Sequence, residues 1–371
     1  MPRHHDDAGP IELPQGKVVG KRWKIVDKLG EGGCGAVYLV EDHKNGAKAA
    51  MKAESNFVAG GSVLKLEVQV LKRMVGRKYV AQLIAAGKKE KYSYMVMTLF
   101  GPSLSRLFKQ CKKQFSVSTQ VRLGVQILYG LKQIHEAGYI HRDIKPANLA
   151  VGRRGRESRI LHVLDFGLSR EYVARNSNGT VEMRRPRENC LFRGTTKYCS
   201  IRTHERYEQG RSDDLYSMMY VLCEMRKSLP WDRLRDKHEI GRMKTSTDVD
   251  TLLADSPKEY KKIFDHLNET KYEQRPDYAM IYKTFAQVIT DKGFKFEEPY
   301  DWESLPENQL TPSEEKKNIP TLNEDASIDK TKTKDSTAKS EEKSSDKAKP
   351  ITNGVMALFP PEEFEKNELG F

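Results

Sequence analysis

Apolar and polar positions alternate with strand-like spacing in the first third of the chain. The stretches Trp23 to Leu39, Ala47 to Ala53 and Tyr92 to Leu99 are rich in β-branched and aromatic residues, and the first contains a run of glycines. This pattern predicts three strand regions, with a glycine turn inside the first. Between them, apolar residues three and four positions apart predict a helix over 62–74.

The pattern changes after Gly101 and Pro102, where apolar residues recur at helical spacing. Long amphipathic segments cover Ser116 to Ala137, Ser212 to Met225 and Tyr278 to Thr290. A β-rich front followed by an α-rich back indicates two segregated lobes and not alternating βαβ units. We therefore predict an α+β, bilobal fold.

The ends of the chain have a different composition. Residues 1–16 are polar and contain three prolines, so we expect a flexible leader. Residues 304–371 are rich in Lys, Ser, Thr, Asp and Glu, and most of this tail cannot bury enough apolar surface to fold, which predicts disorder. Apolar residues occur again near the end of the tail. They have two interpretations: a frayed terminus, or a short segment that docks on a partner or on the folded domain. These residues are Val355, Met356, Leu358, Phe359, Phe364 and Phe371.

Charge and cysteine content narrow the class of protein. The net charge is +12, with +16 on residues 1–303 and −4 on the tail. A basic folded part suits acidic or phosphorylated protein partners. Nucleic acid or an anionic membrane would be attracted by the same positive potential. The five cysteines form no C-x-x-C pair, no signal-like apolar start is present, and no apolar run is long enough for a membrane span. We expect an intracellular protein, cytoplasmic or nuclear.

A glycine-rich motif over 30–37 is the first sign of specific chemistry. Gly30-Glu-Gly32-Gly-Cys-Gly35-Ala-Val37 has the G-x-G-x-x-G spacing that lets backbone amides approach phosphates. A Rossmann turn would need a helix directly after the glycines. Because the chain continues as a predicted strand, the motif favours a flap over ATP.

A lysine and a glutamate that can form a pair follow the glycine motif. Lys52 lies in the predicted strand 47–53, below the flap, where it can bind the α and β phosphates. Glu67 lies fifteen residues on, in the predicted helix, where it can pair with Lys52 and hold it extended. Without that pairing, each would be an ordinary surface charge.

The most specific segment runs from Tyr139 to Asn148. Within six residues it carries Asp143, which can act as the base for a substrate hydroxyl, Lys145, which can neutralise a transferring phosphoryl group, and Asn148, which can bind magnesium. Seventeen residues later, Asp165 opens a D-F-G motif as the main magnesium carboxylate. The order and spacing of these motifs indicate phosphoryl transfer from ATP with Mg²⁺ or Mn²⁺.

At this point the chain resembles the protein kinase superfamily, with one kinase domain over 17–303, an N-lobe over about 17–99 and a C-lobe over about 100–303. Instead of A-P-E, the sequence Ser200-Ile-Arg202-Thr-His resembles the S-I-N-T-H of the casein kinase I group. Phe192-Arg-Gly-Thr195 and Lys237-His-Glu-Ile-Gly241 are closer to its tau-tubulin kinase branch. Lys145 is the serine/threonine form of the catalytic loop.

The resemblance implies further site residues. Met97 would be the gatekeeper, the backbone of Thr98 and Phe100 would hold adenine, and Asp214 would brace the catalytic loop. The implied ATP-binding set is Leu29, Gly30, Glu31, Gly32, Gly33, Cys34, Gly35, Ala36, Val37, Lys52, Met97, Thr98 and Phe100.

Two arginines bear on the activation segment, of which the first departs from the family pattern. Arg202 stands where kinases commonly have the Glu of A-P-E, so Arg275 lacks its usual partner and anchoring must differ. Arg142 precedes Asp143, as in kinases that pair this arginine with an activation-loop phosphate, yet other anions could place the basic segment 183–188.

The resemblance also implies residues for substrate recognition. Lys197 and Arg242 match basic positions with which the casein kinase I group holds an anion, Arg233 adds charge beside them, and Cys190 replaces a third lysine. The alternative is that these are solvated surface charges. The prediction is a serine/threonine kinase, monomeric in its catalytic domain, for acidic or pre-phosphorylated proteins. A pseudokinase scaffold is disfavoured because the catalytic residues are present, and a nucleic-acid reader lacks any motif.

Overall fold

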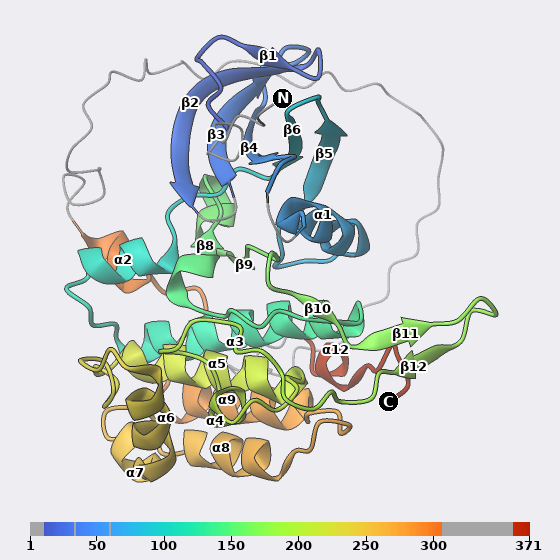
Figure 1. The fold of residues 1–371 in the computed structure, drawn as a ribbon. Coiled ribbons are helices and arrows are strands. Elements are labelled where there is room, and N and C mark those ends of the chain that lie inside the picture. Colours follow the sequence, from blue (N-terminus) through green and yellow to red (C-terminus); the bar gives the residue numbers. More distant parts are fainter. Residues whose placement is uncertain (1–10, 33–34, 59–60, 306–358) are drawn as a thin grey trace, which may run out of the picture.

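The computed structural model describes residues 11–32, 35–58, 61–305 and 359–371. A curled antiparallel sheet forms the upper lobe and helices form the lower one, which confirms the predicted bilobal α+β fold (Figure 1). The strands are β1 Val18–Val19, β2 Trp23–Gly32, β3 Gly35–Asp42, β4 Lys48–Ser55, β5 Leu83–Lys88, β6 Tyr92–Met97, β7 Tyr139–Ile140, β8 Leu149–Val151, β9 Leu161–Val163, β10 Arg170–Glu171, β11 Val173–Arg175 and β12 Val181–Met183. The helices are α1 Val63–Arg73, α2 Leu104–Gln110, α3 Val117–Glu136, α4 Ile201–His204, α5 Arg211–Glu224, α6 Lys237–Ser246, α7 Val249–Leu252, α8 Tyr260–Glu269, α9 Tyr278–Asp291 and α12 Glu362–Glu365, with 3-10 turns η2 Pro146–Asn148, η3 Gly155–Arg159 and η4 Asp301–Ser304.

The upper lobe is a six-stranded sheet in the order β1-β2-β3-β4-β6-β5. The predicted strands are present, whereas the sequence analysis missed β5, whose small residues Ala85, Ala86 and Gly87 carry little strand signal. Residues 11–16 are not a loose leader: Leu13 is buried, and its N–H donates to the Tyr38 hydroxyl over 3.1 Å. The prediction was wrong there because one apolar residue among prolines is enough to fill a gap in the sheet's core.

The lower lobe is built around α3. Every residue of this helix from Ser118 to Glu136 is buried, because α5 and α9 pack on it from one side and β9 and β7 from another. Such complete burial makes α3 a rigid base for the loop that follows it at Gly138.

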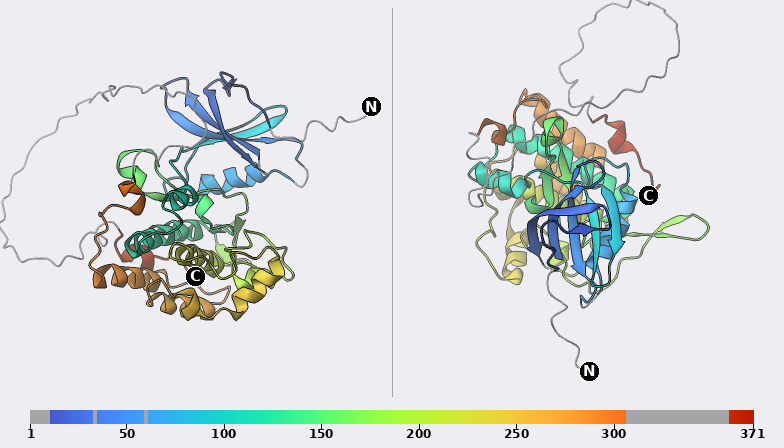
Figure 2. Two further views of the ribbon diagram at one scale, coloured as in Figure 1. Left: turned by 90° about the vertical axis from the view of Figure 1, so that its left-hand side faces the viewer. Right: turned by 90° about the horizontal axis from the view of Figure 1, so that it is seen from above.

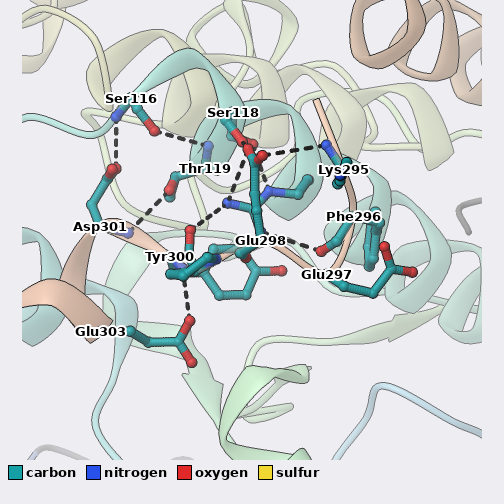
Figure 3. Close-up of polar contacts among 12 residues, drawn as sticks. Ser116, Ser118, Thr119, Lys295, Phe296, Glu297, Glu298, Tyr300, Asp301 and Glu303 are labelled. Atoms are coloured by element: carbon teal, nitrogen blue, oxygen red, sulfur yellow. Dashed lines mark hydrogen bonds and ion pairs between the residues drawn. The ribbon is translucent and has the colours of Figure 1, made fainter. Parts of the chain in front are cut away.

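The end of the domain, residues 295–303, is fastened across α3 (Figure 3). The buried Arg122 guanidinium donates to the carbonyls of Phe296, Glu298 and Pro299 and lies 4.2 Å from the Tyr300 ring. The Asp301 carboxylate accepts the Ser116 N–H over 2.6 Å. These bonds satisfy the buried cation with carbonyl groups, so residues 295–303 close the lobe.

Residues 359–371, called here the C-terminal segment, lie against the helical lobe, with α12 beside α9 (Figures 1 and 2). Phe359 and Phe364 are fully buried there. Of the two interpretations of this terminus, the structure therefore has the one in which it docks on the folded domain. The predicted disorder of the tail falls on residues 306–358, which lie outside the described residues.

None of the helices that the structure describes is long and apolar enough to cross a membrane.

Candidate active site

The position of Glu67 is set by contacts at the start of α1. Ser62 caps this helix by accepting the Lys65 N–H, and Glu54 on β4 accepts the Ser62 hydroxyl and the Val63 N–H. A buried carboxylate at a helix N-terminus is stabilised by free N–H groups and by the helix dipole. Because Glu54 is two residues from Lys52 on the same strand, this cap also fixes α1 relative to Lys52.

Lys52 and Glu67 form a buried ion pair. Their Nζ and Oε2 atoms are 2.6 Å apart, and their side chains are 9% and 2% exposed. Lys52 Nζ also lies 3.6 Å from Asp165 Oδ1. Burial raises the pKa of Glu67, and Lys52 opposes that rise. The three predicted residues are thus brought together below the glycine hairpin.

The glycine motif is a β2–β3 hairpin, as predicted for a flap. A Cβ on Gly30 or Gly32 would meet no atom within 4 Å, whereas on Gly35 it would lie 2.2 Å from the Ala53 carbonyl oxygen. Gly35 is therefore required for close approach of β3 to β4, a role that the sequence did not reveal. Gly33 and Cys34 lie outside the described residues.

The segment joining the lobes presents backbone groups to the same gap. Met97 ends β6 and pairs with Ala50 of β4. The Thr98 N–H donates to the Gln82 carbonyl over 3.1 Å. For the Thr98 carbonyl and the Phe100 N–H, no hydrogen bond is seen within residues 11–32, 35–58, 61–305 and 359–371. An acceptor and a donor two residues apart suit the edge of an adenine ring.

The catalytic-loop residues converge on one carboxylate. Asp143 Oδ2 accepts from Lys145 Nζ over 2.7 Å, and Oδ1 accepts from the Thr195 N–H and hydroxyl over 2.9 and 2.6 Å. Asn148 Nδ2 donates to the Asp143 carbonyl over 2.9 Å, which leaves the Asn148 amide oxygen for another partner. Thr195 is a site residue whose contact with Asp143 the sequence analysis missed.

A buried network holds the backbone of this loop. Asp214 on α5 accepts the N–H groups of His141 and Arg142 over 2.7 and 2.8 Å and pairs with His135 over 2.9 Å. Arg142 has φ +68°, a left-handed conformation that a non-glycine residue keeps only when its surroundings impose it. Burial opposes ionisation of Asp214, but the bond from His135 lowers its pKa below the usual range. The structure thus gives Asp214 the bracing position that the resemblance implied.

Asp165 and Asn148 offer oxygen atoms suited to a divalent metal. Burial opposes ionisation of Asp165, yet the charge of Lys52 lowers its pKa, so this carboxylate is charged near neutral pH. Among the described residues, no group of three or more His, Cys, Asp or Glu side chains is arranged so that it could hold a metal ion by itself. A carboxylate and an amide oxygen, completed by phosphates and water, fit Mg²⁺ coordination.

Two arginines, Arg187 of the basic segment 183–188 and Arg170 of β10, pair with Glu208. This carboxylate is 2% exposed, lies 2.5 Å from Arg187 Nε and lies 3.4 Å from Arg170 Nε. Burial, and then the charge of Arg170, lower the pKa of Arg142 to about 10. Glu208 therefore holds Arg187 of the segment 183–188, the alternative that the sequence had left open, whereas Arg142 Nε donates to the Leu168 carbonyl over 2.7 Å.

The Ser200-Ile-Arg202 segment is anchored through Asp213. The Ser200 hydroxyl caps α4 and donates to Asp213 Oδ1 over 2.5 Å, and the Gly210 N–H donates to Asp213 Oδ2 over 2.6 Å. Arg275 pairs instead with Glu136 over 3.1 Å. This is a different anchoring from the usual Glu–Arg pair, as expected from Arg202.

The same segment predicts a pH effect on stability. Burial, and then the charge of Lys244, lower the pKa of His204 to about 4. Since free histidine titrates near ~6.5, the unfolded chain binds more protons between these values, and stability should fall as the pH decreases from 6.5 to 4. The unfolding temperature, measured from pH 6.5 to pH 4, should decrease less for His204→Gln than for the wild type. Equal slopes of unfolding temperature against pH would contradict the assignment to His204.

The predicted anion-binding residues are not equally available. Lys197 Nζ is 2.5 Å from Glu224 Oε1 and also contacts Asp232 Oδ1. This pairing argues against Lys197 as a free cation for a substrate. Arg233 and Arg242 are exposed, and Arg242 lines a cavity of about 360 Å³ with Ile201 and His204.

Taken together, a glycine-rich hairpin, a buried lysine–glutamate pair and a loop that carries Asp143, Lys145 and Asn148, arranged between two lobes, are the features of a protein kinase. The protein kinase domain family matches residues 23–285, more than half of the chain, so the chain belongs to this family. A Caenorhabditis elegans protein named as a serine/threonine-protein kinase is 48% identical over 309 residues, covering 83% of this chain and 88% of that protein. A Dictyostelium discoideum protein, also named as a serine/threonine-protein kinase, is 38% identical over 295 residues, covering 79% and 59% respectively.

Proposed function

We propose that the protein is an active kinase that transfers the γ-phosphoryl group of ATP to serine or threonine of protein substrates. The observation that supports this most is the convergence of Lys145, Thr195 and Asn148 on Asp143, opposite the Lys52–Glu67 pair. A pseudokinase would need none of these groups together.

ATP would lie between the lobes, with adenine on the Thr98 carbonyl and the Phe100 N–H and with phosphates below the β2–β3 hairpin. Lys52 would bind the α and β phosphates, held in place by Glu67. Asn148 and Asp165 would hold Mg²⁺ or Mn²⁺, which neutralises charge on the β and γ phosphates.

Asp143 would take or orient the proton of the substrate hydroxyl. Its Oδ1 is fixed by Thr195 and its Oδ2 by Lys145, so the carboxylate has one orientation before substrate binds. As the substrate oxygen bonds to the γ-phosphorus, the bond from that phosphorus to the β–γ bridging oxygen breaks and ADP leaves, and Lys145 can stabilise the negative charge on the transferring phosphoryl oxygens. Lys145 in this position favours serine and threonine as acceptors.

The test of acceptor class is a set of three peptides that differ only in carrying Ser, Thr or Tyr. We expect label from ATP on the Ser and Thr peptides in the presence of Mg²⁺ or Mn²⁺, and none after chelation with EDTA. Transfer confined to the Tyr peptide would refute the serine/threonine assignment.

We propose further that the enzyme is of casein kinase I type, in the tau-tubulin kinase branch, and that it prefers acidic or phosphorylated sites. The Ser200–Asp213 anchor and the exposed Arg233 and Arg242 support this. Lys197 would contribute only if a substrate anion displaced Glu224 or Asp232.

Charge reversal separates this preference from general activity. The double variant Arg233→Glu, Arg242→Glu should lower kcat/KM about tenfold on acidic or primed peptides, a barrier change of ~1.4 kcal/mol, and little on neutral ones. The matched control is Lys292→Glu, a similar exposed charge after α9. Equal loss on all peptides would count against substrate recognition by these arginines.

A further inference from the structure

The C-terminal segment fills an aromatic site on the back of the helical lobe. Phe364 is stacked on Tyr282, with ring centroids 4.3 Å apart and planes at 9°. The Phe359 ring lies 5.4 Å from that of Tyr79 and 5.5 Å from that of Tyr129. Both phenylalanines are buried to 1% exposure or less, so the segment is held by core-like packing and not by surface contact.

Polar groups of the domain are also used by this segment. Arg275, which lacks the usual activation-segment partner, donates to the carbonyls of Phe364 and Lys366 over 3.3 and 2.8 Å. The buried Glu136 accepts the Glu368 N–H over 2.7 Å, and the Glu368 carboxylate pairs with Arg77 over 2.6 Å. The buried Glu136 carboxylate is thus satisfied in part by a backbone N–H of the segment, which is unexpected for an incidental contact.

The last residues of the segment reach the activation-segment side of the lobe. Leu369 and Phe371 pack on the small cluster of Ile140, Tyr172 and Val173. Arg211 donates to the Phe371 carbonyl over 3.0 Å and lies 5.0 Å from the Tyr172 ring.

From this cluster, contacts continue to the catalytic loop. The Tyr172 hydroxyl donates to the His135 carbonyl over 2.8 Å, and the His135 ring pairs with Asp214, which holds the N–H groups of His141 and Arg142. Ile140 itself is in β7, directly before His141. The segment therefore touches the elements that hold the strained backbone at Arg142.

Within the described residues, the side chains that form hydrogen bonds or ion pairs with the segment are away from the nucleotide and acceptor sites: Arg77, Tyr129, Glu136, Arg211, Arg275 and Lys283. We propose that the C-terminal segment is an intramolecular activator: docked on α3, α9 and β7, it holds the catalytic loop and the β10–β11 region in the active arrangement. This inference rests on the proposed kinase function. Its occupant is the chain's own terminus, joined to the domain through residues 306–358.

The test uses the full chain with Phe364→Ala, which removes the ring stacked on Tyr282. We expect kcat to fall about tenfold, equivalent to ~1.4 kcal/mol in the barrier, with KM for ATP nearly unchanged. A synthetic peptide of residues 355–371 should restore the activity of the variant when it is added in trans. Because a tethered segment has a high effective concentration, the free peptide is needed at up to roughly millimolar concentration. The same peptide carrying Phe364→Ala should not. The matched control is Phe57→Ala, an exposed phenylalanine in the upper lobe.

Unchanged or increased activity of the Phe364→Ala chain would overturn the proposal. If that variant does not fold, Phe371→Ala replaces it, because this ring is only partly buried, and a fall in kcat is again expected. Hydrogen exchange of the amides of residues 139–142 supplies a readout that does not depend on activity. Faster exchange in the variant is expected; identical exchange would overturn the proposal, whereas an inactive wild-type chain with that difference would refute the kinase function alone.

Discussion

Replacing Asp143 with asparagine is expected to lower kcat for peptide phosphorylation by roughly 10²- to 10⁴-fold, the contribution typical of general acid–base groups. The side chain keeps its size, but an amide cannot accept the proton of the substrate hydroxyl. The amide nitrogen would also point at Lys145 or Thr195, which now donate hydrogen bonds to the carboxylate, so two donors would face each other. The loss should therefore be in kcat, with ATP binding retained.

The matched control for this substitution is Asp255→Asn, an exposed carboxylate on another part of the C-lobe. It should leave both kcat and the unfolding temperature unchanged. A fall in kcat of less than a few fold for Asp143→Asn, measured by initial rates at saturating ATP, would remove Asp143 from the role of base.

Replacing Lys52 with methionine is expected to impair both stability and activity. Glu67 would remain buried without its cation, and breaking a buried pair in this way costs about 3–5 kcal/mol of folding free energy. ATP affinity should fall because the phosphates lose their ammonium contact. The measurements are chemical denaturation and ATP binding by titration calorimetry.

A second substitution separates these two effects. Lys52→Met combined with Glu67→Leu removes the unpaired carboxylate, so stability should recover most of the loss while activity does not. Lys48→Met, on the same strand, is the control and should change neither property much. Recovery of activity in the double variant would show that the pair acts only on folding.

The sequence predicted the residues that act through local spacing. Lys52, Glu67, Asp143, Asn148 and Asp165 belong to motifs whose members occupy one loop, or a strand and the helix after it. Their positions follow once the elements are recognised, because a short loop can present its side chains in few ways.

Contacts between distant ordinary residues could not be predicted. Glu54 as the cap of α1, Thr195 on Asp143, and Glu208 between two arginines are common polar residues, and no local pattern distinguishes them from a solvated surface. The pairing of Lys197 with Glu224 depends in the same way on the tertiary fold.

For the same reason, the sequence left two interpretations open for the C-terminal segment, a frayed terminus or a docked one. Phe359 and Phe364 were visible as apolar residues in an acidic context, but the site that receives them is formed by Tyr79, Tyr129 and Tyr282, which come from three separate parts of the chain. Similarly, Leu13 appeared to belong to a loose leader because its partners lie in the sheet.

The central claim is tested most directly by transfer of label from [γ-³²P]ATP to a protein substrate such as casein. The wild-type chain and the Asp143→Asn variant are compared at equal concentration with Mg²⁺, and the labelled amino acid is identified after hydrolysis. We expect phosphoserine or phosphothreonine from the wild type and almost none from the variant. ATP binding by the wild type without transfer, with Mg²⁺ and with Mn²⁺, would contradict the account and indicate a pseudokinase.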